Sequence, residues 1–488
     1  MPGKYMDDEV SIILRHMQRI AKLHAEYTGP QPRDNAAIAK QAREELAQED
    51  RDAVYYPAES TRGCSLRDTV LAIEELLAQI FVHCLPRMPL YQCNRPSPLW
   101  APMLLAQVSR RWRRVALSTP RLWTSYTLLN QFNLSLFRLW MERSGASPLS
   151  LYADHDSLEV VFAYSRRFGS LNLDLEPSSI PFLAAIRDKV PRLYCLYIEF
   201  PKGTPLATRS ASPCDAFEYA PNLRSVLLKR PAMDFKLPSS QLEQLTIFNA
   251  PGDFLVRACH GASSLTKLYL AAQTIPADFL DMPLCNLVHL KEMWAYDVSR
   301  PEFVPGGLER PTCKIATLLS KFCCPALDKV NIGSLPRLLQ SDHASFQSQI
   351  SSFLTCSPRI TKLKITDLMG EFYEDIILAI LAHCPALEKF ETRHHSEFSA
   401  AFFKRLTYVA GVAPLCPRLR SFNTRCAHAL ESAPAFVEMV ASRWRVVDDD
   451  AVAARLQAIT FSCHHPSCTA TLDGFAAEGL ALTCDYWP

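Results

Sequence analysis

Apolar residues recur at helical spacing in a short segment that begins near residue 75. The pattern is made by Leu76, Leu77, Ile80, Phe81 and Cys84. Because such spacing puts side chains on one face of a helix, this face must be buried against another element. Pro86 and Pro89 end the predicted helix, since a proline lacks the N–H that a helix interior requires.

A second amphipathic helix is predicted in the arginine-rich segment that follows. Its apolar positions are Leu104, Leu105, Val108, Trp112 and Val115. The positions between them are occupied by Arg110, Arg111, Arg113 and Arg114. These arginines keep the opposite face in water, so the helix presents one apolar and one basic face.

A short third helix completes this predicted module. Ser118 or Thr119 can cap it, and Pro120 stands in its first turn, where a missing N–H costs little. Leu122 and Trp123 then close a small core. A unit of about 50 residues lies near the lower size limit for independent folding. We therefore expect its apolar side chains to gain further cover from another protein or domain.

Beyond residue 190 the apolar pattern changes to a repeat of the form P-x-L-x-x-L-x-I. Clear copies begin at Pro191, Pro221, Pro325, Pro358, Pro385 and Pro417, and weaker copies begin at Gln241, Ser264, Asn286 and Arg455. Amphipathic helices are predicted between the later copies, at residues 315–322, 346–354, 376–383 and 402–410, whereas the earlier copies are separated by turns. A helix, a proline and a strand cannot cover their own apolar face, so the units must stack with parallel strands.

These patterns predict a fold class of α+β to α/β with three regions. Residues 1–60 should hold N-terminal helices and a linker, and residues 61–130 the short helical module. Residues 131–488 should form an irregular leucine-rich-repeat solenoid of parallel strands and helices. In the first region, residues 10–27 approximate a heptad seam, which leaves open a weak homodimer through that helix.

In such a solenoid, one strand position of each copy points away from the helices, toward the concave surface. These positions are Tyr197, Leu227, Thr246, Tyr269, Lys291, Asn331, Lys364, Glu391, Asn423 and Thr460. Aromatic, amide and charged side chains together are typical of a surface that binds a protein substrate, and Trp294 and Tyr296 add an aromatic anchor nearby. The alternative interpretation is that they are inert, solvent-facing strand residues.

Composition and charge exclude several classes of partner. Lysine and arginine number 52 against 50 acidic residues, a net charge of +2, so we expect neither nucleic acid nor a membrane as partner. The N-terminus lacks a signal-peptide pattern, and the longest strongly apolar run, residues 376–382, is too short to span a membrane. The expected location is therefore the cytoplasm, the nucleus or both, with the 17 cysteines reduced and buried. Cys324, Cys384 and Cys416 each precede a repeat proline, which indicates a packing position.

Sequence motifs for catalysis are missing. The chain has no G-x-S-x-G, G-x-x-x-x-G-K or G-x-G-x-x-G motif and only 15 glycines, so neither an enzyme nor a cofactor is expected. The segment with Cys463, His464, His465 and Cys468 contains zinc-ligand residue types, but its spacing matches no standard finger, and we predict no metal. The third hypothesis, a metal-dependent enzyme, would depend on this cluster alone.

The segments ELLAQIFVHCLP, MLLAQVSRRWRRVAL and STPRLW resemble an F-box, the helical module that attaches substrate receptors to a ubiquitin ligase. The similarity covers residues 70–128 and is most specific over 107–123. The family usually has a Leu-Pro pair just before its Glu-Leu-Leu, where this chain has Ala72, Ile73 and Glu74. The resemblance implies that the Skp adaptor binds Ile73, Leu76, Ile80, Leu105, Val108, Trp112, Leu122 and Trp123. An ordinary helical subdomain with a tryptophan-filled core is the alternative.

The order of helix, F-box-like module and leucine-rich array resembles the F-box/leucine-rich-repeat proteins of fungi. In that family the module holds the adaptor and the solenoid holds the substrate. The implied function is the substrate-recognition subunit of a cullin-RING, SCF-type ubiquitin ligase, which brings a target close to a ubiquitin-charged enzyme. The implied partners are the Skp adaptor, the cullin and a protein substrate. A non-catalytic interaction scaffold that recruits no ligase is the second hypothesis.

Overall fold

The computed structural model describes residues 74–83, 85, 101–128, 133–204, 213–297, 314–333, 343–366, 373–393, 398–427, 432–446, 453–462 and 466–484. The predictions for residues 1–73, including the heptad seam and Ile73, lie outside these ranges. The chain divides into two compact units, Met1–Ser157 and Leu158–Pro488. Within the described ranges, no helix combines the length and the apolar character that a membrane span requires.

The first unit contains a cluster of short helices. They are α4 (Glu74–His83), α5 (Ala101–Val108), α6 (Arg110–Ser118) and the 3-10 helix η2 (Pro120–Trp123), and α4 packs against the other three. The prediction of one continuous second helix is wrong, because Ser109 is extended and separates α5 from α6. The Ser109 hydroxyl accepts a hydrogen bond from the N–H of Trp112 at 3.1 Å, which caps α6.

The predicted third helix is present as η2, with Pro120 in its first turn. Thr119 precedes it but does not cap it. The Thr119 hydroxyl instead donates a hydrogen bond to the carbonyl of Val115 at 2.6 Å, so it ties the start of η2 back to α6.

One helix and two strands complete the first unit. They are β1 (Ser125–Leu128), α7 (Leu134–Arg143) and β2 (Leu149–Asp154), followed by the 3-10 helix η3 (His155–Ser157), and β1 pairs in parallel with β2. Phe137 and Trp140 of α7 are buried, each with its ring centroid 5.3 Å from that of Tyr126 in β1. An aromatic core therefore forms directly after the predicted module.

The second unit is built on one large parallel sheet. Its strands, in the order in which they pair, are β3 (Phe168–Asp174), β4 (Cys195–Glu199), β5 (Ser225–Lys229), β6 (Gln244–Pro251), β7 (Lys267–Thr274), β9 (Glu292–Asp297), β11 (Lys329–Gly333), β12 (Lys362–Thr366), β13 (Lys389–Arg393), β14 (Ser421–Ala427), β15 (Ala458–Ser462) and β16 (Ala481–Cys484). A small parallel pair is formed by β8 (Cys285–Asn286) and β10 (Phe322–Cys323). This repeating parallel arrangement confirms the prediction of an α/β architecture.

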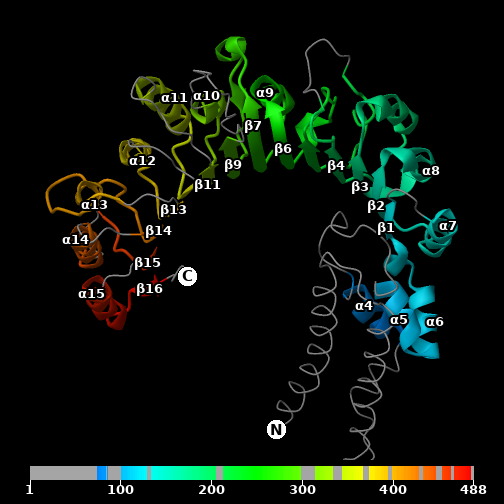
Figure 1. Ribbon diagram of the computed structural model, residues 1–488, viewed down its shortest axis with the longest axis horizontal. Coiled ribbons are helices and arrows are strands. Elements are labelled where there is room, and N and C mark those ends of the chain that lie inside the picture. The colour runs from blue at the N-terminus through cyan, green and yellow to red at the C-terminus, as the bar shows by residue number, and fades with distance from the viewer. Residues whose placement is uncertain are drawn as a thin grey trace, which may run out of the picture. The chain divides into compact units, whose positions relative to one another are not determined.

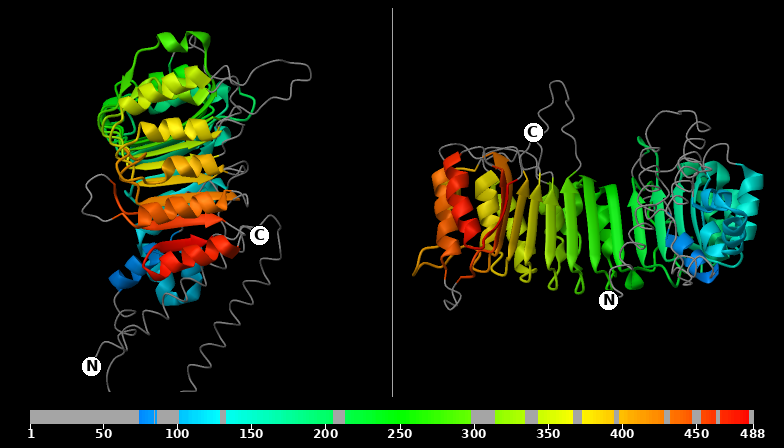
Figure 2. Two further views of the ribbon diagram at one scale, coloured as in Figure 1. Left: turned by 90° about the vertical axis from the view of Figure 1, so that its left-hand side faces the viewer. Right: turned by 90° about the horizontal axis from the view of Figure 1, so that it is seen from below.

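Helices lie on one face of this sheet (Figure 1). They are α9 (Gly252–Cys259), α10 (Lys314–Leu319), α11 (His343–Thr355), α12 (Tyr373–Ala382), α13 (Ala400–Leu406), α14 (Ala433–Trp444) and α15 (Pro466–Ala477). Two further views show them stacked side by side over the strands (Figure 2). We call the opposite face, which none of these helices covers, the open face.

The connections differ between the two halves of the sheet, but the prediction of turns alone before residue 290 is wrong, because the α-helix α9 connects β6 to β7. Short elements precede β6: α8 (Leu158–Phe162) and the 3-10 helices η4 (Ser165–Arg167), η5 (Pro177–Ile186) and η6 (Ser239–Gln241). After β9, α-helices connect the strands in the described residues. The last predicted helix, over 402–410, is shorter than expected and ends at Leu406.

The helix-covered face carries a continuous apolar row. The hydrogen-bond register aligns Leu171, Leu196, Val226, Leu245, Leu268, Met293, Val330, Leu363, Phe390, Phe422 and Ile459, and none of these is more than 1% exposed. Burial of one such side chain contributes roughly 1.5–3 kcal/mol, so this row is a main source of the unit's stability. Cys324, Cys384 and Cys416 are buried free thiols, as predicted, whereas Cys356 is half-buried.

Candidate functional site

The helical module leaves part of its apolar surface exposed. In its interior, Phe81 of α4 is buried, and its ring centroid lies 4.8 Å from that of Trp112 in α6. On its surface, Leu76 is 41% exposed and Val108 is 51% exposed. Ile80 and Trp112 are half-buried. Among the predicted adaptor contacts, Leu76 and Val108 are therefore the most accessible to a partner.

Three other predicted adaptor contacts lie inside the unit: Leu105, Leu122 and Trp123, which are 3%, 1% and 0% exposed. The indole N–H of Trp123 donates to the carbonyl of Ala116 at 2.8 Å, and the Trp140 ring of α7 packs edge-on against it at 4.7 Å. The Arg143 guanidinium lies 4.5 Å from the same ring. All three side chains are thus buried within their own unit, the tryptophan against helix α7, and offer a foreign subunit almost no surface.

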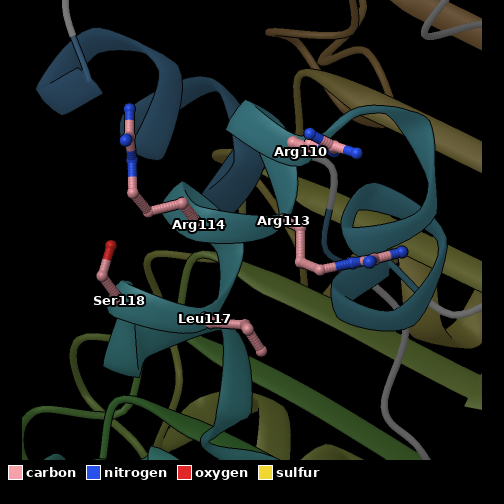
Figure 3. A pocket seen from close by; sticks show the side chains of 5 residues that line it. All are labelled: Arg110, Arg113, Arg114, Leu117 and Ser118. Carbon is pink, nitrogen blue, oxygen red and sulfur yellow. The ribbon is translucent and has the colours of Figure 1, made fainter.

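Arginines surround the exposed side of α6. A surface hollow is lined by Arg110, Arg113, Arg114, Leu117 and Ser118, all from that helix (Figure 3). The Nε of Arg113 donates to the carbonyl of Ala106 at 2.8 Å, and Arg114 pairs with Glu74 at 2.5 Å. Leu117 is 36% exposed. Leu117 is not among the predicted contacts, because it lies outside the apolar stripe of α6.

The register of the sheet aligns one side chain per strand into a row on the open face, which we call the central row. From β3 to β16 its members are Asn172, Tyr197, Leu227, Thr246, Tyr269, Trp294, Asn331, Lys364, Glu391, Asn423, Thr460 and Thr483. Every position predicted to face outward belongs to it except Lys291. Lys291 immediately precedes β9, and Trp294 occupies its predicted place, because Leu290 and Met293 form the apolar pair of that repeat.

An aromatic cluster lies in the middle of the open face. The ring centroids of Tyr269 and Trp294 are 5.3 Å apart, and those of Trp294 and Tyr296 are 6.2 Å apart. All three side chains are half-buried. Gly333, the register partner of Tyr296, gives this ring its space, because a Cβ at that position would collide with it. Such rings provide contact area at a small entropic cost.

Lysines flank this cluster on the strand position two residues before the central row. In register from β7 to β13 the residues are Lys267, Glu292, Lys329, Lys362 and Lys389, which we call the lysine row. Glu292 accepts hydrogen bonds from the Lys329 ammonium at 2.6 Å and from the Trp294 indole at 2.8 Å. Burial alone raises the pKa of the Glu292 carboxyl, but these bonds and the nearby Lys267 bring that pKa below its ordinary value. One carboxylate is thus placed among several ammonium groups.

Asn331 separates the aromatic cluster from the next charged pair. Its side chain is 1% exposed, and its Oδ1 accepts no hydrogen bond from any residue in the described ranges. The following two members of the central row, Lys364 and Glu391, form an ion pair at 2.5 Å. An unsatisfied buried carbonyl oxygen is costly, so Asn331 is a candidate acceptor for an N–H brought by a ligand.

At the β4–β5 end of the open face, the polar and charged side chains bond to one another. Glu199 of β4 accepts a hydrogen bond from the Tyr197 hydroxyl and forms ion pairs with Lys229, at 2.9 Å, and with Arg230. Burial and this hydrogen bond both raise the pKa of Tyr197 above its ordinary value. Because Glu199 offsets part of the positive charge of Lys229 and Arg230, this network offers less attraction to an anionic partner than the lysine row.

The described residues contain no group of three or more potential ligands that could hold a metal ion. Cys463, His464 and His465 of the segment considered for zinc lie outside those residues. Burial raises the pKa of Cys384 and of Cys416 to about 12, with smaller influences from neighbouring groups. Thiols with such pKa values are poor nucleophiles and poor metal ligands at neutral pH.

Comparison of the sequence with protein-family models finds no matching family, and comparison with curated proteins finds no matching relative.

Proposed function

We propose that the protein is the substrate-recognition subunit of a cullin-RING, SCF-type ubiquitin ligase. In this proposal residues 61–130 act as an F-box, and the second unit is an irregular leucine-rich-repeat solenoid. The observation that carries the proposal is the exposure of Leu76 and Val108, at two positions where the F-box resemblance implies contact with the Skp adaptor. Apolar side chains left in water on a small helical module are stabilised by a partner that covers them.

The open face of the second unit is the proposed place for the protein substrate. It offers a row of outward side chains that no helix in the described part of this unit covers, with aromatic rings and lysines in its middle. The protein would act by holding the target near a ubiquitin-charged enzyme, and it would perform no chemistry of its own. A receptor of this kind works in the cytoplasm, the nucleus or both.

The structure sets the scale of the adaptor contact. Full burial of a Leu or Val side chain is worth about 1.5–3 kcal/mol. With Leu76 and Val108 about half exposed, covering both would contribute roughly 1.5–2.5 kcal/mol, which corresponds to at least about a tenfold change in Kd. An aspartate at either position would also place a charge in the contact and weaken it further.

The test is binding of the purified full chain to the Skp adaptor by titration calorimetry. We expect the wild type to bind, and the double variant Leu76→Asp/Val108→Asp to lose at least about tenfold in affinity. The matched control is Leu284→Asp/Val412→Asp, because these side chains of the second unit are similarly exposed, at 53% and 60%. The control should bind as the wild type does. A folded wild-type chain that does not bind the adaptor would refute the ligase function.

An interaction scaffold that recruits no ligase remains the second candidate. The observation in its favour is that the chain itself covers Leu105, Leu122 and Trp123, which the F-box resemblance implies are available to the adaptor. Absence of adaptor binding together with retained binding of a protein partner by the second unit would favour this scaffold.

A further inference from the structure

The middle of the open face combines positive charge and aromatic surface within five neighbouring strands. In the lysine row, four of the five positions from β7 to β13 carry ammonium groups. The chain as a whole is nearly neutral, with a net charge of +2, so this row is a local feature. On β5 and β6 the same register position carries Ser225 and Gln244, which shows where the charged stretch ends.

The carboxylates of the chain neutralise this row only in part. Glu292 bonds to Lys329 at 2.6 Å, and Asp328 approaches Lys362 only to 3.9 Å, with both of these side chains about half exposed. Such an exposed pair contributes little, so the Lys362 ammonium stays available. Lys389 is exposed, and no carboxylate in the described residues pairs with it. Lys362 and Lys389 therefore offer two adjacent positive charges to a partner.

From these observations we infer that the open face between β7 and β13 binds an acidic peptide segment, whose carboxylates contact the lysine row and whose apolar or aromatic side chains contact Tyr269 and Trp294. This inference rests on the proposed function and names the chemical class of its substrate. The segment would run across the strands, since both rows do so.

The spacing of the sheet suits such a segment. Neighbouring strands lie about 4.8 Å apart, and alternate side chains of an extended peptide are about 6.8 Å apart. Flexible lysine side chains cover this small difference, so two carboxylates of the peptide can reach Lys362 and Lys389 together. The Oδ1 of Asn331, unpaired among the described residues, would accept an N–H from the peptide once the side chains that cover it move aside.

Lysines beside aromatic rings also occur in surfaces that bind single-stranded nucleic acid. Two anions on this face argue against that ligand. Glu292 lies within the lysine row and Glu391 in the central row, and both would repel a continuous phosphate backbone. A peptide with separated carboxylates avoids them.

The experiment measures fluorescence anisotropy of a labelled synthetic peptide, alternating glutamate with phenylalanine, on titration with the full chain. We expect saturable binding that weakens as salt is added, because exposed charge pairs are screened. The same peptide with glutamine in place of glutamate should bind at least about tenfold more weakly, and a lysine version should not bind. Tighter binding of oligodeoxythymidine than of the acidic peptide would overturn the inference.

A charge-reversed variant locates the site. Lys362→Glu/Lys389→Glu should weaken peptide binding about tenfold or more, since it replaces two attractions by two repulsions. The matched control is Lys189→Glu/Lys404→Glu, at two exposed lysines outside the strands of the open face. Equal loss in both variants, or no loss in the first, would refute the site. Adaptor binding, measured on the same preparations, should be unchanged. If the chain binds the adaptor but not the peptide, this inference alone is overturned. If the chain does not bind the adaptor, the proposed function is overturned.

Discussion

Arg443 of α14 is fully buried, and no carboxylate in the described residues pairs with its charge. Its guanidinium donates to the carbonyls of Leu406 and Leu415 at 2.6 Å each and of Cys416 at 3.2 Å. These acceptors belong to the segment that leads from α13 to β14, in which Cys416 has a positive φ of 50°. Burial lowers the pKa of Arg443 below its ordinary value. We therefore expect this one side chain to fix the conformation of residues 407–416.

The Arg443→Met change measures that contribution. Hydrogen bonds to a charged group are worth about 1.5–3 kcal/mol each, so three of them amount to roughly 4.5–9 kcal/mol. Returning the guanidinium to water recovers several kcal/mol of this, because burying a charge is itself costly. The net loss should be about 2–4 kcal/mol. Methionine keeps helix propensity and most of the volume, so the loss reports on the hydrogen bonds rather than on a cavity.

Native-state hydrogen exchange is the appropriate assay, because it resolves one segment of a long repeat protein. Amides of residues 407–416 should exchange about 30 to 1000 times faster in Arg443→Met, at 1.4 kcal/mol per factor of ten. The control is Arg405→Met, an exposed arginine on α13, where no change beyond about 0.5 kcal/mol is expected. Unchanged protection of residues 407–416 in Arg443→Met would refute the reasoning.

Two further predictions concern other buried side chains. Trp123→Ala should destabilise the first unit by about 3–5 kcal/mol and make it sensitive to limited proteolysis, whereas Leu76→Ala should leave it resistant; a resistant Trp123→Ala variant would contradict the packing of Trp123 against Trp140. Cys384 and Cys416 should escape iodoacetamide at pH 8 in the native protein and react after unfolding in urea, since with a pKa of about 12 only about one thiol in 10,000 is ionised; mass spectrometry that finds either of them alkylated before unfolding would disprove this protection.

The repeat pattern identified most strands of the second unit because each copy combines a chain reversal with inward apolar residues. Strands β1, β2, β3 and β16 escaped prediction, since their segments match the L-x-x-L-x-I part of the repeat only incompletely. The error at Lys291 has a related cause. The sequence from Asn286 offers two apolar pairs three residues apart, Leu287 with Leu290 and Leu290 with Met293, and without a repeat proline the local pattern fits both. Only pairing with β7 and β11 decides between them.

For the buried polar groups, the local sequence predicts neither their burial nor their hydrogen-bond partners. Arg443 stands in a helix beside other charged and aromatic residues, and no local signal marks it as buried, because its partners lie about 30 residues earlier. The position of Asn331 on the open face was predicted, but its unpaired Oδ1 was not. Whether a side chain finds hydrogen-bond partners depends on all of its neighbours in space. Periodicity predicts which face a residue occupies, whereas hydrogen-bond partners depend on tertiary packing.

The adaptor surface is smaller in the structure than predicted, because other parts of the same chain cover some of the predicted contacts. A module of four short helices exposes Trp123 until another element covers it, and α7 supplies that cover with Trp140 and Arg143. Leu76 and Val108 together would give a partner roughly 1.5–2.5 kcal/mol, whereas micromolar binding requires about 8 kcal/mol. The proposed adaptor interface must therefore include polar surface. The arginines of α6 around Leu117 offer such surface, so complementary acidic side chains on the adaptor follow from the proposal.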